Sequence, residues 1–440
     1  MTNHEAQGTK HSLSRYWLLI GVTALAVAGL FSLVLVMART PSLSSIPLFD
    51  AMFHKSLAVH VDLSVLVWFL AIACMMWSLL AEGSRTVFPL LEEAALVSFG
   101  LGTFCIAISP LGGNNQALMS NYIPVITSPL FFLGLALLFC GVGLMLVKAL
   151  TAKWSERFSP SLRYGIFVGA LIAVIALLAF VWSYRQLAHD FEPQLYYEML
   201  FWGGGHLLQF LHVQMVMVCW LLLSASAAPR KDKLYYVLFT LGLLAALAAP
   251  YVYIMYNVAS DEHRVFFTHS MIMVAGIAPT VLALVLAPSI WRTRAKNALW
   301  ACFAMSVLLF LYGGVLGGMI EGQNVVIPAH YHGSIVGVTL AFMGVAYLLL
   351  PEFGYRDVSK WKMAFWQPIV YGGGQALHIS GLAWSGGYGV LRKTPGGLDA
   401  LPTSVKAAMG LMGLGGTIAI IGGFMFVIVV WRAIRHPRKA

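Results

Sequence analysis

Histidine is the residue type in this chain that is best suited to chemistry, and its spacing is informative. The chain has 13 histidines among 440 residues. His330 and His332 lie two residues apart in the segment PAHYHG, and residues two apart on an α-helix point about 200° apart around its axis. This geometry suits two planar cofactors such as haems, one on each side of the helix. It does not suit a single metal ion held by both residues, which prefers i and i+4 spacing. The alternative is a pair of helix-start histidines hydrogen-bonded to loop carbonyls.

The composition indicates that these histidines lie in a membrane protein. Hydrophobic residues make up 60% of the chain and charged residues 10%, with a mean hydropathy of +0.82. A soluble globular protein has about 25% charged residues. The chain is therefore predicted to be an all-α polytopic membrane protein with no room for a soluble domain of ordinary size. In such a protein the net charge of +10 indicates orientation, and we do not expect nucleic acid as a partner.

The cysteines narrow the choice of cofactors. All five lie in apolar stretches, and no CxxC or CxxCH spacing occurs in the sequence. They are predicted to be small core residues. This excludes iron–sulfur clusters and covalently attached haem as cofactors that the chain could hold alone. The five are Cys74, Cys105, Cys140, Cys219 and Cys302.

Twelve apolar runs, each close to the 20 or so residues that cross a bilayer, organise the chain into passes. They lie at about 16–38, 56–81, 88–111, 124–147, 164–183, 197–227, 234–256, 265–290, 297–320, 324–350, 363–386 and 403–431. An even number of passes puts both termini on one side. Placing that side in the cytoplasm assigns 20 of the 27 lysines and arginines to it, as the positive-inside rule requires. We expect a multi-pass protein of the bacterial inner (plasma) membrane, with a membrane domain at 16–432 and cytoplasmic tails at 1–15 and 433–440.

With this direction, six histidines share one depth in the outer half of the membrane. Burying an imidazole in a bilayer is costly unless its nitrogens find a partner or a metal. Core histidines scattered at random would have no reason to agree in depth. The pattern predicts a layer of haem or metal ligands near the outer surface. The six are His60, His206, His269, His330, His332 and His378.

Four patches of the sequence resemble subunit I of the haem-copper oxidase superfamily, which also includes the nitric oxide reductases. They are IPAHYHGSIVGVTLAFMGVAYLLLPEFG around His330, KSLAVHVDLSVLVW around His60, FWGGGHLLQF around His206, and GVLRKTPGG, which contains Arg392 and Lys393. In topology the resemblance covers the whole chain. It implies a twelve-helix, all-α bundle of the subunit I type.

The resemblance also implies roles for single residues. His60 and His332 match the two axial ligands of a low-spin haem, and His330 matches the proximal ligand of a high-spin haem. His206 matches the helix 6 histidine that binds the second metal of the active site. Arg392 and Lys393 lie where the family places basic residues against haem propionates, although ordinary solvated loop charges would also account for them.

The chain departs from the family at the second metal. The family's other two copper ligands are an adjacent His-His pair near the outer end of helix 7, where residues 249–257 contain no histidine. Catalytic copper and iron sites normally recruit three or more protein ligands, so a second metal, copper or iron, remains an open question. A tyrosine that the family links to the helix 6 histidine is replaced by Phe210. Tyr251, Tyr253 and Tyr256 could place a phenol nearby, or could belong to an interfacial aromatic belt.

Other polar residues do not outline a proton path across the inner half of the membrane, so proton pumping does not follow from this sequence. Asp62, two residues after His60, is predicted to be buried. A buried carboxylate within a membrane span is a functional candidate by default. It could equally accept a hydrogen bond from a neighbouring helix.

Our first interpretation is a membrane respiratory oxidoreductase subunit with two-haem electron transfer, which reduces a diatomic gas at the high-spin haem. Oxygen is the expected substrate, as in cytochrome c oxidase subunit I, and nitric oxide is the close alternative. A non-catalytic haem electron relay or gas sensor is a second class, and a transporter without a cofactor is a third. The expected partners are membrane lipid, the gas, and an electron-donor subunit or cytochrome c.

Overall fold

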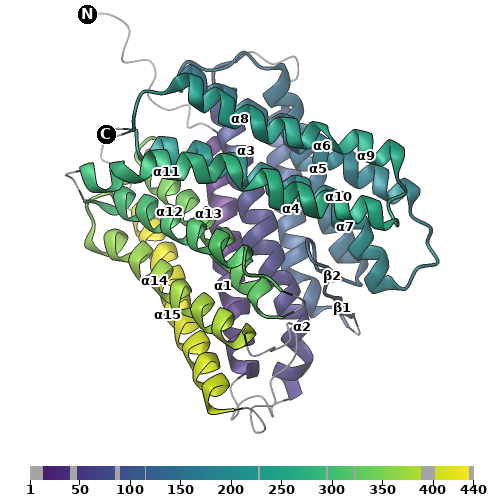
Figure 1. The fold of residues 1–440 in the computed structure, drawn as a ribbon. Helices are drawn as coiled ribbons and strands as arrows, with labels where there is room; N and C mark the ends of the chain where they lie inside the picture. The colour runs from purple at the N-terminus through teal and green to yellow at the C-terminus, as the bar shows by residue number, and fades with distance from the viewer. Residues whose placement is uncertain are drawn as a thin grey trace, which may run out of the picture.

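The computed structural model describes residues 13–39, 47–84, 90–113, 115–225, 228–293, 296–321, 324–387 and 402–435. The predicted tails lie largely outside these ranges. Within them the fold is α-helical apart from one β-hairpin (Figure 1). The helices are α1 (Ser14–Arg39), α2 (Pro47–Val61), α3 (Trp68–Leu80), α4 (Leu91–Ile108), α5 (Pro129–Thr151), α6 (Pro160–Gln186), α7 (Pro193–Leu223), α8 (Asp232–Leu247), α9 (Ala249–Met255), α10 (Asp261–Ser270), α11 (Ile277–Arg292), α12 (Ala298–Gly317), α13 (Val326–Leu349), α14 (Lys362–Gly386) and α15 (Thr403–Arg435).

The predicted passes correspond to these helices. Eleven helical segments in the described part of the chain are long and apolar enough to cross a membrane. The remaining predicted run, 363–386, is the eleventh in chain order and corresponds to the 25-residue helix α14, which is long enough but more polar. Some passes combine two or more elements. The second contains α2 and α3, the seventh contains α8 and α9, and the eighth contains α10 and α11.

The beginning of α1 and the end of α15 lie at the same end of the bundle (Figure 1). The backbone N–H of Arg356, in the connection between α13 and α14, donates to the carbonyl of Ala433 near the end of α15 at 3.4 Å. In the same connection, burial raises the pKa of Tyr355, and the charge of nearby Arg15 at the start of α1 partly offsets that rise. Both ends of the described chain therefore meet one connection, as an even number of passes requires.

Two passes contain π-helical turns. Segment η1 (Asp62–Val67) begins two residues after His60, and η3 (Met271–Ala275) joins α10 to α11. The hydroxyl of Ser64 donates to the His60 carbonyl at 2.6 Å, which gives that carbonyl a partner where the helix widens. Single π-turns inside α-helices occur frequently at functional sites. The turn at η1 changes the direction of the side chains that follow His60.

The start of α13 packs directly on α12 through two glycines. A Cβ atom added to Gly313 would lie 2.5 Å from the backbone nitrogen of Ser334, and one added to Gly333 would lie 2.6 Å from the Cα atom of Gly313. Small residues at such contacts let membrane helices approach closely. Because Gly333 directly follows His332, this contact fixes the histidine-bearing turn of α13 against α12.

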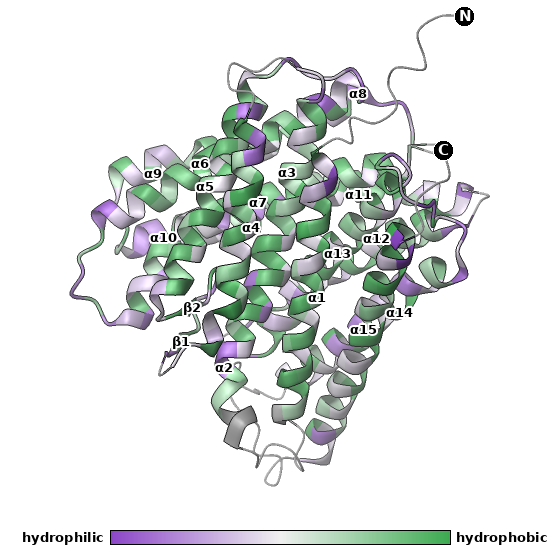
Figure 2. Cartoon of the chain, turned by 180° about the vertical axis from the view of Figure 1, so that it is seen from behind, coloured by the Kyte–Doolittle hydropathy of each residue, from purple (hydrophilic) through white to green (hydrophobic). Residues whose placement is uncertain are grey.

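The outer surface of the bundle is apolar over the middle of the helices, with hydrophilic residues at their ends (Figure 2). Large exposed side chains on many helices form this surface, for example Leu101, Leu178, Leu284 and Ile421. So extensive an apolar surface is not compatible with water and matches a hydrocarbon environment. The chain is therefore a multi-pass membrane protein.

We predict that Gly313→Ala lowers the thermal stability of the protein in detergent. The new methyl group would force α12 and α13 apart, and overpacking of this kind costs about 1–3 kcal/mol. Gly314→Ala is the matched control, because a Cβ atom there meets nothing within 4 Å. Equal unfolding midpoints for the two variants, measured by the same thermal-shift assay, would contradict this account of the contact.

Candidate functional site

The two histidines of α13 face different neighbours. The Nδ1 atom of His330 lies 2.7 Å from the carbonyl of Gly313 on α12. The Nδ1 atom of His332 lies 2.8 Å from the Pro328 carbonyl of its own helix, and its ring lies 5.3 Å from that of His378 on α14. The alternative interpretation expected hydrogen bonds to loop carbonyls, whereas both carbonyls found here belong to helices. Both contacts are made by Nδ1, and a hydrogen bond at Nδ1 is compatible with ligation through Nε2.

Three other histidines of the predicted layer follow the same rule. His60 on α2 places its Nδ1 atom 2.9 Å from the carbonyl of Ala28 on α1. In His378 the corresponding contact is to Met412 on α15, at 2.8 Å. His206 on α7 places Nδ1 2.7 Å from the Trp202 carbonyl one turn earlier. Five imidazoles thus hold one nitrogen against a backbone oxygen.

This shared contact selects one tautomer. A carbonyl oxygen can only accept, so Nδ1 must carry the proton and Nε2 must carry the lone pair. Metal-ligating histidines are oriented in this way, by a hydrogen bond from the nitrogen that does not bind the metal. The described residues contain no group of three or more His, Cys, Asp or Glu that could hold a metal ion alone. Haem iron needs only one or two protein ligands, so these residues fit haem better than a free ion.

Some sequence-predicted residues are not part of this arrangement. His269 is exposed on the surface of α10. His212 is buried on α7, where its ring lies edge-on to that of Phe69 at 4.7 Å. Arg392 and Lys393 lie outside the residues that the structure describes. Their contact with haem propionates therefore stays a prediction.

The tyrosines at the end of the seventh pass and the carboxylate Asp62 also have defined surroundings. Tyr251 and Tyr256 are exposed, as belt residues would be, whereas Tyr253 is buried and shares a 2.8 Å hydrogen bond with the hydroxyl of Ser183. Asp62 is 1% exposed. Neither of its carboxyl oxygens has a hydrogen-bond partner among the described residues. The expected hydrogen bond from a neighbouring helix is therefore not found there.

Sequence reasoning missed the residues around His206. The hydroxyl of Tyr122, in the connection between α4 and α5, lies 2.8 Å from its Nε2 atom. His206 also contacts the rings of Trp202 and Phe267, at 4.9 and 5.7 Å between centroids. His263 on α10 packs on the same Phe267 ring at 5.0 Å. The four-residue spacing of polar side chains along α7 is the one sequence signal that points to this neighbourhood.

A second polar cluster lies at the other end of the bundle, where α1 begins. Buried Glu92 of α4 accepts hydrogen bonds from Ser78 and, at 3.3 Å, from the indole N–H of Trp17, and it forms an ion pair with Lys148 of α5. Ser14 and Ser78 share a further hydrogen bond of 2.6 Å. The carboxylate has several partners, so this cluster ties four helices together.

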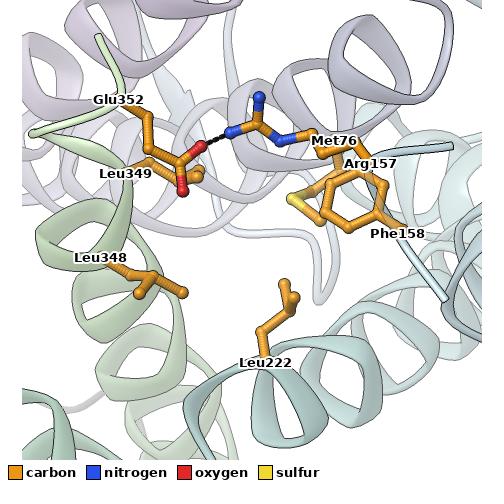
Figure 3. Close-up of a pocket in the computed structure, with 7 residues that line it drawn as sticks. All are labelled: Met76, Arg157, Phe158, Leu222, Leu348, Leu349 and Glu352. Atoms are coloured by element: carbon orange, nitrogen blue, oxygen red, sulfur yellow. Dashed lines mark ion pairs between the residues drawn. The ribbon is translucent and has the colours of Figure 1, made fainter. Parts of the chain in front are cut away.

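A cavity of about 350 Å³ lies near the same end (Figure 3). At its edge Arg157 forms an ion pair with Glu352 and another with Glu82, the latter at 3.3 Å. No histidine borders it. Its remaining wall is apolar and consists of Met76, Phe158, Leu222, Leu348 and Leu349. The histidine layer, and not this cavity, is therefore the candidate site.

Comparisons with known proteins identify the family of the chain. The family described as Cytochrome C and Quinol oxidase polypeptide I matches residues 12–431. An uncharacterized protein of Rickettsia prowazekii (strain Madrid E) is 33% identical over 95% of both chains. One of Aquifex aeolicus (strain VF5) is 28% identical over 78% of this chain and 85% of its own.

The fold is also that of a solved structure. A haem-copper terminal oxidase dimer determined by cryo-EM superposes with a TM-score of 0.77, covering 97% of this chain and 85% of that chain at 17% identity. Together with the family match, this confirms the resemblance that the four sequence patches indicate. The chain belongs to the cytochrome c and quinol oxidase polypeptide I family, the subunit I family of the haem-copper oxidases, and is a membrane subunit of the respiratory oxidoreductase type.

Proposed function

We propose that this protein is a two-haem oxidoreductase subunit that reduces a diatomic gas, with oxygen as the first candidate. His60 and His332 would hold a low-spin haem, and His330 would hold a high-spin haem on the other side of α13. When bound, haem supplies one-electron transfer and, where the iron keeps an open position, binding of a diatomic gas. The observation that carries the proposal is the set of Nδ1-to-carbonyl contacts, which prepares each imidazole for ligation through Nε2.

The positions of the two α13 histidines support two haems in preference to one. His330 lies against α12, where its Nδ1 would be 2.6 Å from a Cβ atom on Gly317, and His332 lies beside His378 of α14. One helix therefore separates the two imidazoles and sends them toward different neighbours. A short separation of this kind favours rapid electron transfer between two cofactors.

A haem electron relay or gas sensor is the second candidate. The observation that favours it is the neighbourhood of His206, whose two ring nitrogens both have partners, Trp202 and Tyr122. A site without a second metal can bind a gas without reducing it. Nitric oxide reduction remains the alternative within the enzyme class, and the donor subunit or cytochrome c remains a proposed partner.

The ligand assignment predicts which substitution removes which haem. His60→Ala and His332→Ala should each abolish the low-spin absorption bands and halve the haem per chain, while the high-spin haem still binds carbon monoxide. His330→Ala should do the reverse. Reduced-minus-oxidised spectra and pyridine haemochrome assays measure both quantities. His269→Ala, on the exposed face of α10, is the control and should match the wild type. Unchanged spectra in all three ligand variants would refute the assignment.

His378 offers a sharper test, because its ring lies beside that of His332 and its Nδ1 is held in the same way. We expect His378→Ala to retain both haems, since His332 matches the family ligand. The spectra described above decide between the two residues. If His378→Ala loses the low-spin haem and His332→Ala keeps it, the axial ligand is on α14 and our assignment is wrong.

Gas turnover separates the enzyme from the relay. With an artificial electron donor, the purified protein should consume oxygen, and His330→Ala should reduce that rate to background. A Clark electrode measures oxygen, and a nitric oxide electrode tests the alternative substrate. Two haems per chain with no uptake of either gas would favour the relay or sensor.

A further inference from the structure

One face of α7 is built to receive the connection between α4 and α5. Gln194, Glu198, Trp202 and His206 recur every four residues and therefore lie on one side of the helix. Each of the four contacts a residue in the loop of the β-hairpin formed by β1 (Ala117–Leu118) and β2 (Val125–Ile126). The loop is thus aligned along α7 from its first turn to His206.

Hydrogen bonds hold the hairpin loop in place at two levels. The backbone N–H of Met119 donates to the Gln194 side chain at 3.0 Å. One turn further along α7, the Glu198 carboxylate accepts from the backbone N–H of Asn121 at 2.9 Å and also from the Asn121 side-chain amide. These bonds position the next residue, Tyr122, over the following two turns of α7.

Tyr122 reaches His206 because Gly205 has no side chain. A Cβ atom on Gly205 would overlap the Tyr122 ring. The phenol ring packs on Trp202 at 5.7 Å and on the imidazole of His206 at 4.7 Å between centroids. Its hydroxyl lies 2.8 Å from Nε2 of His206. The contact therefore depends on the hydrogen bonds that hold the hairpin loop, on the missing side chain of Gly205 and on packing against Trp202.

The direction of this hydrogen bond follows from the other side of the ring. Nδ1 of His206 faces the Trp202 carbonyl at 2.7 Å and must donate to it. In a neutral imidazole Nε2 is then an acceptor, so the Tyr122 hydroxyl donates. A phenol carries its proton at neutral pH, so Tyr122 has a hydrogen to donate. The lone pair that a metal would need is engaged by a hydrogen bond.

The surrounding residues do not assemble a metal site. His263 is 0% exposed and has no hydrogen-bond partner for either ring nitrogen within the described residues. It is the one other imidazole that shares the Phe267 ring with His206. Where the family has a His-His pair, the end of the seventh pass places Tyr253, whose hydroxyl is bonded to Ser183. Two imidazoles fall short of the three or more ligands that catalytic copper and iron sites recruit.

We propose, on the basis of the function above, that the gas site of this protein contains no second metal ion and that the hydrogen-bonded pair of Tyr122 and His206 replaces it. A diatomic molecule in this site would meet an imidazole held by a phenol. Tyr122 acts through His206 and is a positioning residue. Its role is to fix the imidazole of His206 and to occupy Nε2, the atom that would otherwise bind a metal ion.

The first measurement is the metal content of the haem-loaded protein, purified from cells grown with added copper. Mass spectrometry should find iron equal to the haem content, and copper, zinc and manganese well below one per chain. One non-haem metal per chain, lost in both His206→Gln and His263→Gln while the haem is retained, would overturn the inference.

The second measurement is the carbon monoxide stretching band of the reduced protein. Tyr122→Phe removes the donor to Nε2 and should shift the band. Gly205→Ala keeps the phenol but displaces its ring, so it should shift the band in the same direction and serves if Tyr122→Phe does not fold. Tyr251→Phe, exposed on α9, is the control and should leave the band unchanged. A band identical to wild type in both Tyr122→Phe and Gly205→Ala would overturn the proposed pair.

The haem assay separates this inference from the proposed function. A preparation without haem has no carbon monoxide band, and both proposals then fail. A preparation with two haems and one further metal per chain, lost in His206→Gln and His263→Gln, refutes only the inference. Two haems, no further metal and a shifted band in the two variants support it.

Discussion

A neutral imidazole inside an apolar bundle must satisfy its N–H group, and much of this structure follows from that constraint. An unpaired polar group costs several kcal/mol in a hydrocarbon environment. In His60, His206, His330, His332 and His378 a backbone carbonyl meets the need at 2.7 to 2.9 Å. Because the carbonyl takes Nδ1, the ring is fixed in orientation and in tautomer. In His60, His330 and His332, the proposed haem ligands, the same contact both satisfies the N–H group and orients the ring.

The carbonyls come from neighbouring helices in three of the five cases, so helix packing and ligand geometry depend on each other. His60 needs α1, His330 needs α12 and His378 needs α15. A small displacement of any of these helices would break a hydrogen bond and rotate an imidazole. The backbone contact of Gly313 with Gly333 is therefore part of the site, although neither residue has a side chain to offer. Close packing by small residues is common between membrane helices. Here it also holds His330 and His332, the proposed ligands, in position.

The sequence allowed the fold to be predicted closely, because the bilayer imposes a length and an apolarity on every pass. The run at 363–386 became helix α14, Lys362–Gly386, and the run at 403–431 lies within α15. The histidines could also be found from the sequence, because a polar ring is rarely buried at that depth in a membrane without a function. Their partners could not, because Ala28, Gly313 and Met412 contribute only backbone oxygens, which no residue type reveals. Tyr122 was missed for a related reason. It lies 84 residues from His206 in a loop whose sequence carries no ligand motif.

The two ends of the bundle differ in how their buried carboxylates are paired. Near the start of α1, charges are compensated within the protein, as in the pairs of Glu92 with Lys148 and of Arg157 with Glu352. The carboxylate of Glu92 is buried, and breaking its pair would leave an uncompensated charge, so that pair acts as a fixed link. In the histidine layer the ring nitrogens of His263 and the carboxyl oxygens of Asp62 have no partners among the described residues. An unpartnered ionisable group inside a membrane bundle is a functional-site hypothesis by default. These groups lie in the same layer as the oriented imidazoles. Polar groups without protein partners are expected in a site that cofactors and substrate complete, as in the function we propose.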